Sequence, residues 1–297
     1  MASSSVSIRP VVPTVPIRGG VCDNPRSLRK RILQQMCLVL PALALALLVA
    51  FPQATPQQQD RHPVAMIGIP QEIAPVEARL KPSTVTQIQG VIFTSGSIDG
   101  TPIVAARSGA GKVNAAFAAT LLVDHFSPSA VIFTGTAGAI DTELNPGDVV
   151  IGTAVGYHDF GNITTDGFVR SPTRNEASGK LDPALFPADP GLLAAARRAA
   201  ATLKTQIREG VIVTGDAFLA NPARRLELRR ELNASAVEME GAAVAQICAR
   251  FGVPAIVIRS ITDHADGGAD NSYRRNVDLA ARNASELALA TIREMKR

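Results

Sequence analysis

Residues 237–266 read VEMEGAAVAQICARFGVPAIVIRSITDHAD, and this stretch decides the fold. A short strand-like run ends near Glu238, an Ala-rich helical pattern follows Glu240, and a second β-branched run leads to Asp263. A strand, a helix and a strand in succession indicate an α/β protein. Carboxylates stand at the ends of both strand-like runs, where burying a charge is costly unless it is paired. The stretch therefore predicts an α/β fold whose strand ends open into one acidic pocket.

The same alternation extends from residue 63 to the C-terminus. Runs rich in Val and Ile predict strands at residues 64–70, 90–96, 101–108, 130–138, 147–156, 209–215, 236–239 and 254–262. Helical patterns begin near residues 112, 190, 222, 240 and 272. Nearly continuous apolar strands are buried on both faces, which favours parallel pairing. We expect a single α/β domain over residues 61–297, with a central mixed, largely parallel twisted sheet flanked by helices.

Charge is unevenly distributed along the 297 residues, whose formal net charge is +4. Residues 1–51 contain six basic residues and one acid, so they carry +5 and the remainder carries −1. Aromatic residues make up 4% of the chain, and no basic stripe lies outside the first segment. Because nucleic-acid-binding domains concentrate basic residues on one face, we expect no nucleic-acid partner.

Residues 1–60 form a leader with the order of an export signal. A basic n-region precedes an apolar segment at residues 36–51, and a polar linker follows. We expect the leader to interact with the membrane or the export machinery, and its cleavage to give a periplasmic or secreted protein. An uncleaved anchor formed by residues 36–51 is the alternative, although Pro41 interrupts a segment that is short for a membrane span. A mis-annotated start codon would leave the protein cytoplasmic.

Two of the three cysteines, Cys22 and Cys37, lie in the leader. Cys248 is then alone in the domain, so it has no partner for an intrachain disulfide. It stands in an apolar helical pattern, which indicates packing. No His and Cys residues have the spacing of metal ligands, and we predict neither a metal nor a cofactor.

Small-residue turns follow several of the predicted strands, and three of them contain the sequences SGAGK, TGTAG and VTGDAFLAN. Ligands of open α/β sheets bind at the carboxyl ends of the strands. Glycines there let the backbone approach a ligand. SGAGK is not a phosphate-binding loop, because that motif has four residues between its glycines and a Ser or Thr after the lysine. The polar, Gly- and Pro-rich residues 157–186 predict a long loop with a functional role.

Four blocks resemble the signatures of 5′-methylthioadenosine/S-adenosylhomocysteine nucleosidases, in the purine nucleoside phosphorylase-like superfamily. They are residues 107–122, 131–140, 213–221 and 237–266, within a similarity that covers about residues 64–297. The resemblance implies a nucleoside phosphorylase-like catalytic domain. It also implies hydrolysis of the N-glycosidic bond of 5′-methylthioadenosine, S-adenosylhomocysteine or a related purine nucleoside, which releases the base. Such a reaction needs an acid for the base, a group that holds the ribose, and an activated water.

The resemblance assigns two of these tasks within residues 237–266. Asp263 matches the general acid that donates a proton towards N7 of adenine, a role that a raised pKa at a buried strand end would support. Glu240 matches the glutamate that accepts hydrogen bonds from the ribose hydroxyls. Met239 matches the methionine that packs against the ribose and its thio substituent. We interpret Glu238 as a supporting residue.

The resemblance assigns the third task, activation of water, to Glu72. Its alignment with the water-activating glutamate of the family requires a gap of one residue. Ser108 and Arg259 match positions that help to hold the water and its neighbours. Because Arg259 lies within an apolar strand, it needs a partner, and Glu72 is the predicted one.

The base and the 5′ substituent call for apolar contacts. By resemblance, Phe218 stacks on adenine and the backbone of Leu219 contacts the edge of the base. Tyr273 stands where the family usually has a phenylalanine, which we interpret as contributed by the neighbouring subunit of a homodimer. The hydroxyl of Tyr273 leaves the 5′ substituent open. Because an exported enzyme would meet extracellular nucleosides, 5′-deoxyadenosine, adenosine and inosine remain candidate substrates.

Two other functions stay open. A phosphorylase needs cationic side chains for phosphate, yet Phe133 and Thr134 precede the GTAG turn, which leaves Arg107 and Lys112 as candidates. An exported, non-catalytic nucleoside-binding protein would need Glu240 and Phe218 but neither Asp263 nor Glu72. Since all four are present, we expect an enzyme, and water as its nucleophile.

Overall fold

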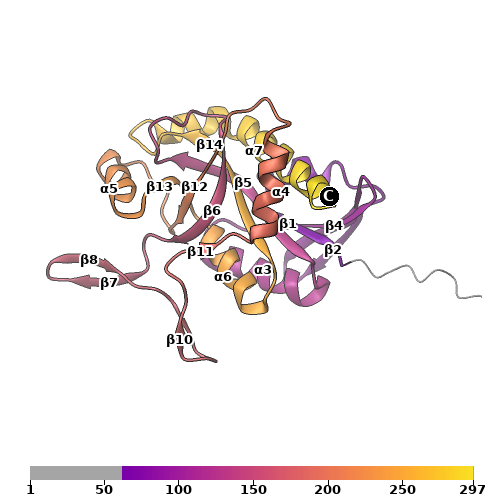
Figure 1. The fold of residues 1–297 in the computed structure, drawn as a ribbon, viewed down its shortest axis with the longest axis horizontal. Helices are drawn as coiled ribbons and strands as arrows, with labels where there is room; N and C mark the ends of the chain where they lie inside the picture. The colour runs from indigo at the N-terminus through magenta and orange to yellow at the C-terminus, as the bar shows by residue number, and fades with distance from the viewer. Residues whose placement is uncertain (1–61, 297) are drawn as a thin grey trace, which may run out of the picture. The chain divides into compact units, whose positions relative to one another are not determined.

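A mixed sheet of ten strands forms the centre of residues 62–296, the part of the chain that this computed structural model describes (Figure 1). The strands follow the order β11-β6-β12-β13-β5-β1-β4-β3-β2, and β14 pairs with both β5 and β6. Their bounds are β1 Val64–Gly68, β2 Thr84–Ile88, β3 Val91–Ile98, β4 Thr101–Arg107, β5 Ala130–Ala139, β6 Val149–Tyr157, β11 Phe186–Pro187, β12 Ile207–Thr214, β13 Ala234–Glu238 and β14 Ala255–Asp263.

The sheet is parallel at its centre. β1 pairs in parallel with β4 and β5, β5 with β14, and β12 with β6 and β13. Antiparallel pairs join β2 to β3, β3 to β4, β11 to β6, β13 to β5 and β14 to β6. The central strands are buried along almost their whole length, as parallel strands covered on both faces are. The predicted fold class, a mixed and largely parallel sheet flanked by helices, is confirmed.

Five of the strands close into a ring, in the order β5, β14, β6, β12 and β13. Gly138, near the end of β5, pairs with Val237 of β13 on one side and with Asp263 of β14 on the other. The closure therefore brings the carboxyl ends of β13 and β14 to the same glycine. These are the two strands that carry the acids of residues 237–266.

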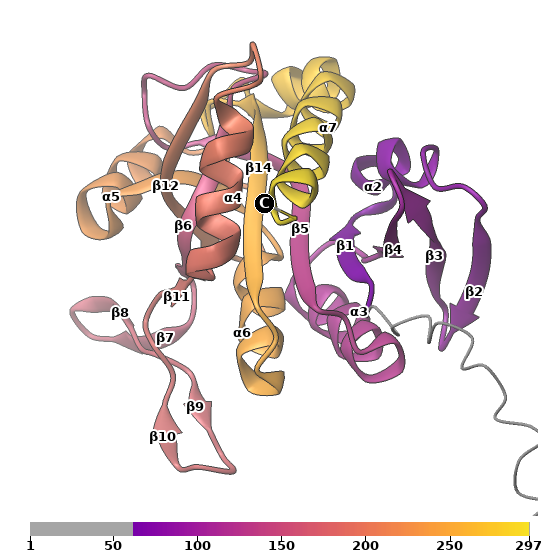
Figure 2. The same ribbon diagram turned by 45° about the vertical axis from the view of Figure 1, so that its right-hand side comes forward.

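Helices cover both faces of the sheet (Figures 1 and 2). α3 (Lys112–Phe126) and α6 (Gly241–Phe251) pack on one face, against residues that include Ala65 and Ile67. α2 (Pro70–Glu77), α4 (Pro190–Ala200) and α7 (Ala269–Glu294) pack on the other, against residues that include Val64 and Met66. Alternate residues of β1 thus enter opposite cores, as the period of two requires. α5 (Pro222–Leu232) packs through Leu228 beside β13.

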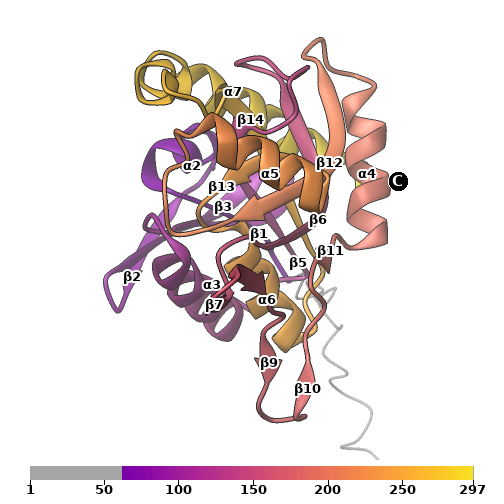
Figure 3. The ribbon, with the colours of Figure 1, turned by 90° about the vertical axis from the view of Figure 1, so that its left-hand side faces the viewer.

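Three segments differ from the sequence prediction. α2 was not predicted; Pro70 stands in its first turn, where proline is well tolerated, and Pro75 lies inside the helix. β2 is an exposed edge strand without the apolar run that predicts a strand. Residues 157–186, predicted as a loop, form two hairpins that project from the sheet (Figures 1 and 3), with strands β7 Gly161–Thr164, β8 Gly167–Arg170, β9 Arg174–Asn175 and β10 Lys180–Leu181.

The leader, including the apolar segment at residues 36–51, lies outside the described residues. Its export and its cleavage stay predictions. Within residues 62–296, no helix is both long enough and apolar enough to cross a membrane.

Candidate active site

A cavity of about 280 Å³ opens where the carboxyl ends of β5, β13 and β14 meet. The start of α2, the loop after β12 and the first turns of α7 complete its wall. Seven of the nine predicted site residues line it: Glu72, Phe218, Leu219, Met239, Glu240, Asp263 and Tyr273. The other two, Ser108 and Arg259, are buried but are not part of its lining.

Glu72 is held at the start of α2 with 4% of its surface exposed. Its Oε1 accepts hydrogen bonds from the Thr136 amide at 2.8 Å and the Thr136 hydroxyl at 2.7 Å. Burial raises the pKa of Glu72, and the charge of Arg259 and the bonds from Thr136 oppose that rise. A buried carboxylate with a raised pKa and fixed orientation is suited to take a proton from water.

Arg259 is fully buried, and its ion-pair partner is Glu238. Its Nη2 lies 2.6 Å from Oε2 of Glu238, and its guanidinium carbon lies 3.9 Å from the ring centroid of Phe133. The prediction that Glu72 is the partner is wrong, because the glutamate at the end of β13 lies closer than the one on α2. Arg259 still acts on Glu72 through its charge.

Glu238 in turn fixes the backbone that presents Glu240. Its Oε2 accepts hydrogen bonds from the Glu240 amide at 3.1 Å and the Gly241 amide at 2.7 Å, and its Oε1 accepts one from the Thr214 hydroxyl. This bonding pattern is what the interpretation of Glu238 as a supporting residue requires.

Glu240 stands at the start of α6 and faces the cavity. Its Oε1 accepts a hydrogen bond from the Gly111 amide at 2.8 Å, in the turn before α3. Burial, followed by the charge of Glu238, raises the pKa of Glu240 to about 7. A carboxylate held by one oxygen keeps the other free to accept hydrogen bonds from a ligand.

Asp263 ends β14 and is 1% exposed. Its Oδ2 accepts a hydrogen bond from the Thr262 hydroxyl at 2.7 Å, and its Oδ1 accepts one from the Ala265 amide at 2.8 Å. Burial raises the pKa of Asp263, against the effect of these bonds. The carboxyl is therefore oriented from both sides and is shifted towards its protonated form, as a general acid requires.

Two glycines of β5 make room for the acids. A Cβ atom on Gly135 would lie 2.4 Å from Oε2 of Glu72 and 2.9 Å from Nη1 of Arg259. One on Gly138 would lie 2.9 Å from Oδ1 of Asp263. The sequence interpretation connected the GTAG turn with backbone approach to a ligand. The structure shows that these glycines admit the protein's own carboxylates.

Aromatic and apolar side chains form the rest of the wall. Phe218 and Tyr273 meet edge to face with their ring centroids 6.0 Å apart, and Met239 and Leu219 line the cavity beside them. Tyr273 lines the cavity of its own chain, because α7 follows directly from β14 and its first turns stay beside the strand that carries Asp263. Its predicted contribution to a neighbouring subunit stays a prediction.

Ser108 follows β4 directly, and its amide donates to the Gly68 carbonyl at 2.8 Å. Its hydroxyl is buried and has no hydrogen-bond partner within residues 62–296. The Thr134 hydroxyl on β5 is in the same condition. Neither side chain lines the cavity.

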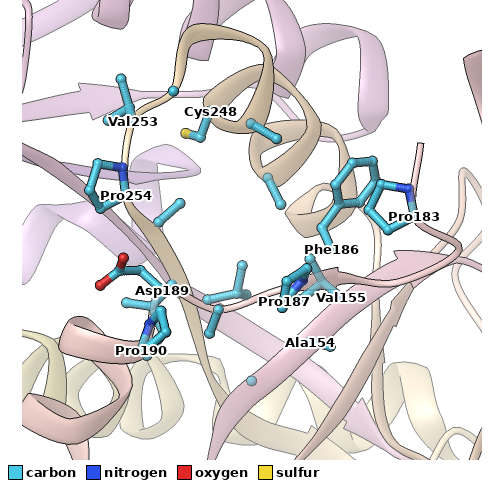
Figure 4. Close-up of a pocket in the computed structure, with 18 residues that line it drawn as sticks. Ala154, Val155, Pro183, Phe186, Pro187, Asp189, Pro190, Cys248, Val253 and Pro254 are labelled. Atoms are coloured by element: carbon cyan, nitrogen blue, oxygen red, sulfur yellow. The ribbon is translucent and has the colours of Figure 1, made fainter. Parts of the chain in front are cut away.

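A second cavity, of about 360 Å³, lies between β6, β11 and the end of α6 (Figure 4). Apolar and proline side chains surround it, with Phe186, Pro187, Cys248 and Pro254 among them. Its one carboxylate, Asp189, caps α4 by accepting a hydrogen bond from the Leu192 amide at 2.9 Å. No pair of acid and base faces this space, so the acidic cavity is the candidate active site.

Among the described residues, no group of His, Cys, Asp and Glu is arranged to hold a metal ion.

Comparison with known proteins identifies the family of the chain. Residues 64–293 match the family model described as the phosphorylase superfamily. The 5′-methylthioadenosine/S-adenosylhomocysteine nucleosidase of Psychromonas ingrahamii is 40% identical over 230 residues, which are 75% of this chain and 95% of the relative. The enzyme of the same name from Anoxybacillus flavithermus is 38% identical over 239 residues, which are 79% of this chain and 99% of the relative.

Solved structures give the same result. The Neisseria meningitidis nucleosidase of that name, in complex with methylthio-immucillin-A, has a TM-score of 0.71 and 34% identity, covering 78% of this chain and 98% of its own. Futalosine hydrolase of Helicobacter pylori has a TM-score of 0.69 and 27% identity, covering 79% of this chain and 98% of its own.

Replacing Arg259 by methionine tests the buried ion pair. Removing one partner of a buried pair leaves an uncompensated charge, so Arg259→Met should lower the free energy of unfolding by about 3–5 kcal/mol. Without the guanidinium, the buried carboxyls of the folded protein bind protons more readily than those of the unfolded chain. Protonation therefore stabilises the folded variant as the pH falls. Urea titrations should show a smaller decrease in the free energy of unfolding at about pH 5 than at about pH 8. Arg197→Met breaks the exposed pair with Glu209, which solvent screens, and should lower the free energy of unfolding far less. Equal losses in the two variants would contradict this account.

Proposed function

The chain belongs to the phosphorylase superfamily and, within it, to the 5′-methylthioadenosine/S-adenosylhomocysteine nucleosidases, and from this premise we propose its reaction. It hydrolyses the N-glycosidic bond of 5′-methylthioadenosine, S-adenosylhomocysteine or a related purine nucleoside, giving the free base and a ribose or thioribose. The observation that carries this proposal is that two buried carboxyls with raised pKa, those of Asp263 and Glu72, line one cavity. One can give a proton while the other takes one.

Each acid has one step of the reaction. Asp263 donates its proton to the leaving purine, so that the base departs neutral. Glu240 accepts hydrogen bonds from the ribose hydroxyls, and its carboxylate stabilises the positive charge that develops on the sugar. Glu72 removes a proton from water as the oxygen attacks the anomeric carbon. Phe218 stacks on the base, and Met239 packs against the ribose.

Water rather than phosphate is the nucleophile. Within residues 62–296, no lysine or arginine lines the cavity. Arg107, one candidate for holding phosphate, forms a two-pronged hydrogen-bonded pair with Glu77, and Lys112 is paired with Asp159. A dianion placed in a cavity that five carboxyl side chains line, with no cation among the lining residues, would lose its hydration and gain little in return.

The 5′ substituent sets the substrate range. Tyr273 brings a hydroxyl to the wall of the cavity, and its pKa is raised by burial and then by the charges of Glu72, Glu240 and Asp263. A polar group in this wall accepts a 5′ substituent that forms hydrogen bonds as well as an alkylthio group. We therefore include adenosine, which has a 5′-hydroxyl, among the nucleosides to be assayed. 5′-Deoxyadenosine, which lacks that hydroxyl, and inosine, which differs in its base, are the comparisons.

A homodimer is part of the proposal. Val113 and Phe117 lie one turn apart on α3, and their exposed fractions are 80% and 47%. Hydrophobic side chains on one face of an otherwise packed helix are typical of an interface. A second copy of the chain is the partner that we propose for this face.

The reaction is tested by release of free adenine from methylthioadenosine, with and without phosphate. Release in both conditions is expected, and Asp263→Asn should lower kcat by about 10²–10⁴-fold while the fold is retained, because the proton donor is lost. Glu286→Gln, on the exposed surface of α7, is the control and should leave kcat unchanged. Release only with phosphate would indicate a phosphorylase, and no release would indicate a binding protein. Near-normal kcat in Asp263→Asn would refute the assignment of the acid.

The pKa of Glu240, at about 7, predicts a dependence of KM on pH. Below that pH the carboxyl is protonated and is a poorer acceptor for two ribose hydroxyls, so KM should rise by up to about tenfold per pH unit as the pH falls. Initial rates between about pH 5 and pH 9 measure this. Glu240→Gln should have a high KM that no longer changes with pH in this way. A KM that falls with decreasing pH in the unmodified enzyme would contradict the role.

Replacing Phe117 by glutamate tests the dimer. The unmodified protein should sediment as a dimer at micromolar concentration, and Phe117→Glu should shift it towards monomer because a charge on an apolar interface must be desolvated. Val85→Glu, on the exposed edge strand β2, serves as control and should leave the mass unchanged. A monomeric unmodified protein would refute the proposal.

A further inference from the structure

Three turns that are far apart in the sequence meet beside the active-site cavity. They are the SGAGK turn before α3, the residues that follow β6, and the GDAF loop that follows β12. Each supplies one charged side chain to the meeting point: Lys112, Asp159 and Asp216. None of these three lines the cavity, so none has a task in the reaction described above.

The start of α3 is capped from outside the helix. Its N-cap, Gly111, has no side chain and a φ of 87°, a conformation that favours glycine. The Gly111 amide donates to Oε1 of Glu240 at 2.8 Å, and the Lys112 amide donates to Oδ1 of Asp216 at 2.8 Å. Two adjacent amides of one turn therefore join the acid that holds the ribose to the loop that holds the base.

Asp159 connects the other two charged groups. The ammonium of Lys112 donates to its Oδ1 at 2.7 Å and to its Oδ2 at 2.9 Å, and the Asp216 amide donates to Oδ2 at 2.8 Å. The same ammonium lies 3.4 Å from Oδ2 of Asp216. Burial would raise the pKa of Asp159, yet these bonds hold it below its usual value. The carboxylate is therefore ionised and bonded at neutral pH.

The loop tied down in this way is the one that forms the base side of the cavity. Residues 217–219 follow Asp216 directly and all line the cavity. Their position depends on the preceding Asp216, whose amide and side chain are both bonded to the other two turns. Glu72 and Asp263 have no hydrogen bond to this group among the described residues.

We propose that Lys112, acting through Asp159 and Asp216, is a positioning residue that sets the spacing between the base-binding loop at residues 217–219 and the ribose-binding Glu240. This proposal rests on the proposed nucleosidase function for its effect on turnover. Its effect on the loop does not depend on catalysis. Because the two proton-transferring acids are anchored elsewhere, loss of Lys112 weakens binding more than it slows the chemical step.

The test compares Lys112→Met, which removes the charge at similar length, with Lys112→Arg, which keeps it. Lys112→Met should raise KM for methylthioadenosine and the inhibition constant Ki of free adenine by similar factors of about tenfold or more, with a smaller change in kcat. Adenine has no ribose, so its Ki reports on the base side of the cavity without the contribution of Glu240. Lys112→Arg should recover most of the loss. A variant that is merely less stable would lose kcat with KM and Ki unchanged, and that result would overturn the proposal.

A double-mutant cycle and a control variant away from the cavity complete the comparison. If Lys112 acts through Asp216, the double variant Lys112→Met with Asp216→Ala should raise the Ki of adenine no further than the worse single variant. Fully additive effects would refute the coupling. Arg197→Met, which breaks an exposed pair of 2.7 Å far from the cavity, should leave KM, kcat and Ki unchanged.

Hydrogen–deuterium exchange without ligand separates this proposal from the proposed reaction. In Lys112→Met, the amides of residues 111–112 and 215–219 should exchange about tenfold faster than in the unmodified protein, while those of β14 should not change. Unchanged exchange in these segments would overturn the positioning role even if the enzyme is active. Faster exchange in a protein that releases no adenine would refute the nucleosidase and leave the positioning role standing.

Discussion

The structure depends on one buried ion pair, between Arg259 on β14 and Glu238 at the end of β13. An isolated guanidinium at zero exposure would cost several kcal/mol of desolvation, so the carboxylate is obligatory once the arginine is inside. The same Glu238 oxygen accepts the amides that lead into α6, and this sets the direction of Glu240. The positive charge also limits how far burial raises the pKa of Glu72. The charge of Arg259 thus acts on three glutamates: it pairs with Glu238, and it lowers the pKa that burial raises in Glu240 and Glu72.

The second constraint is the closure of the five-strand ring. Gly138 pairs with Val237 on one side and Asp263 on the other, so the ends of β13 and β14 cannot separate. The acids that stand 25 residues apart in the sequence, Glu238 and Asp263, meet because of this glycine. Backbone pairing at Gly138, which does not depend on side chains, therefore brings the carboxyl side chains of the cavity together.

Much of this could be predicted from the sequence, and the remainder has physical reasons. The apolar strands and the position of Asp263 after β14 follow from local pattern, because side-chain period and strand ends are local properties. The partner of Arg259 could not be predicted, since two glutamates were available and only tertiary distance distinguishes them. That the Tyr273 side chain lines the cavity of its own chain depends on the path of α7. Ring closure depends on long-range pairing, which no local pattern encodes.

Gly135 has a further consequence for how mutations in this protein are interpreted. It supplies no functional group, yet a single methyl group there would overlap the carboxylate of Glu72 and crowd Arg259. A scan of substitutions would rank this position beside the acids of the cavity, although Gly135 contributes no side chain to it. The carboxylate of Glu72 needs the space that a side chain at position 135 would fill. A search for reactive groups alone would overlook this requirement.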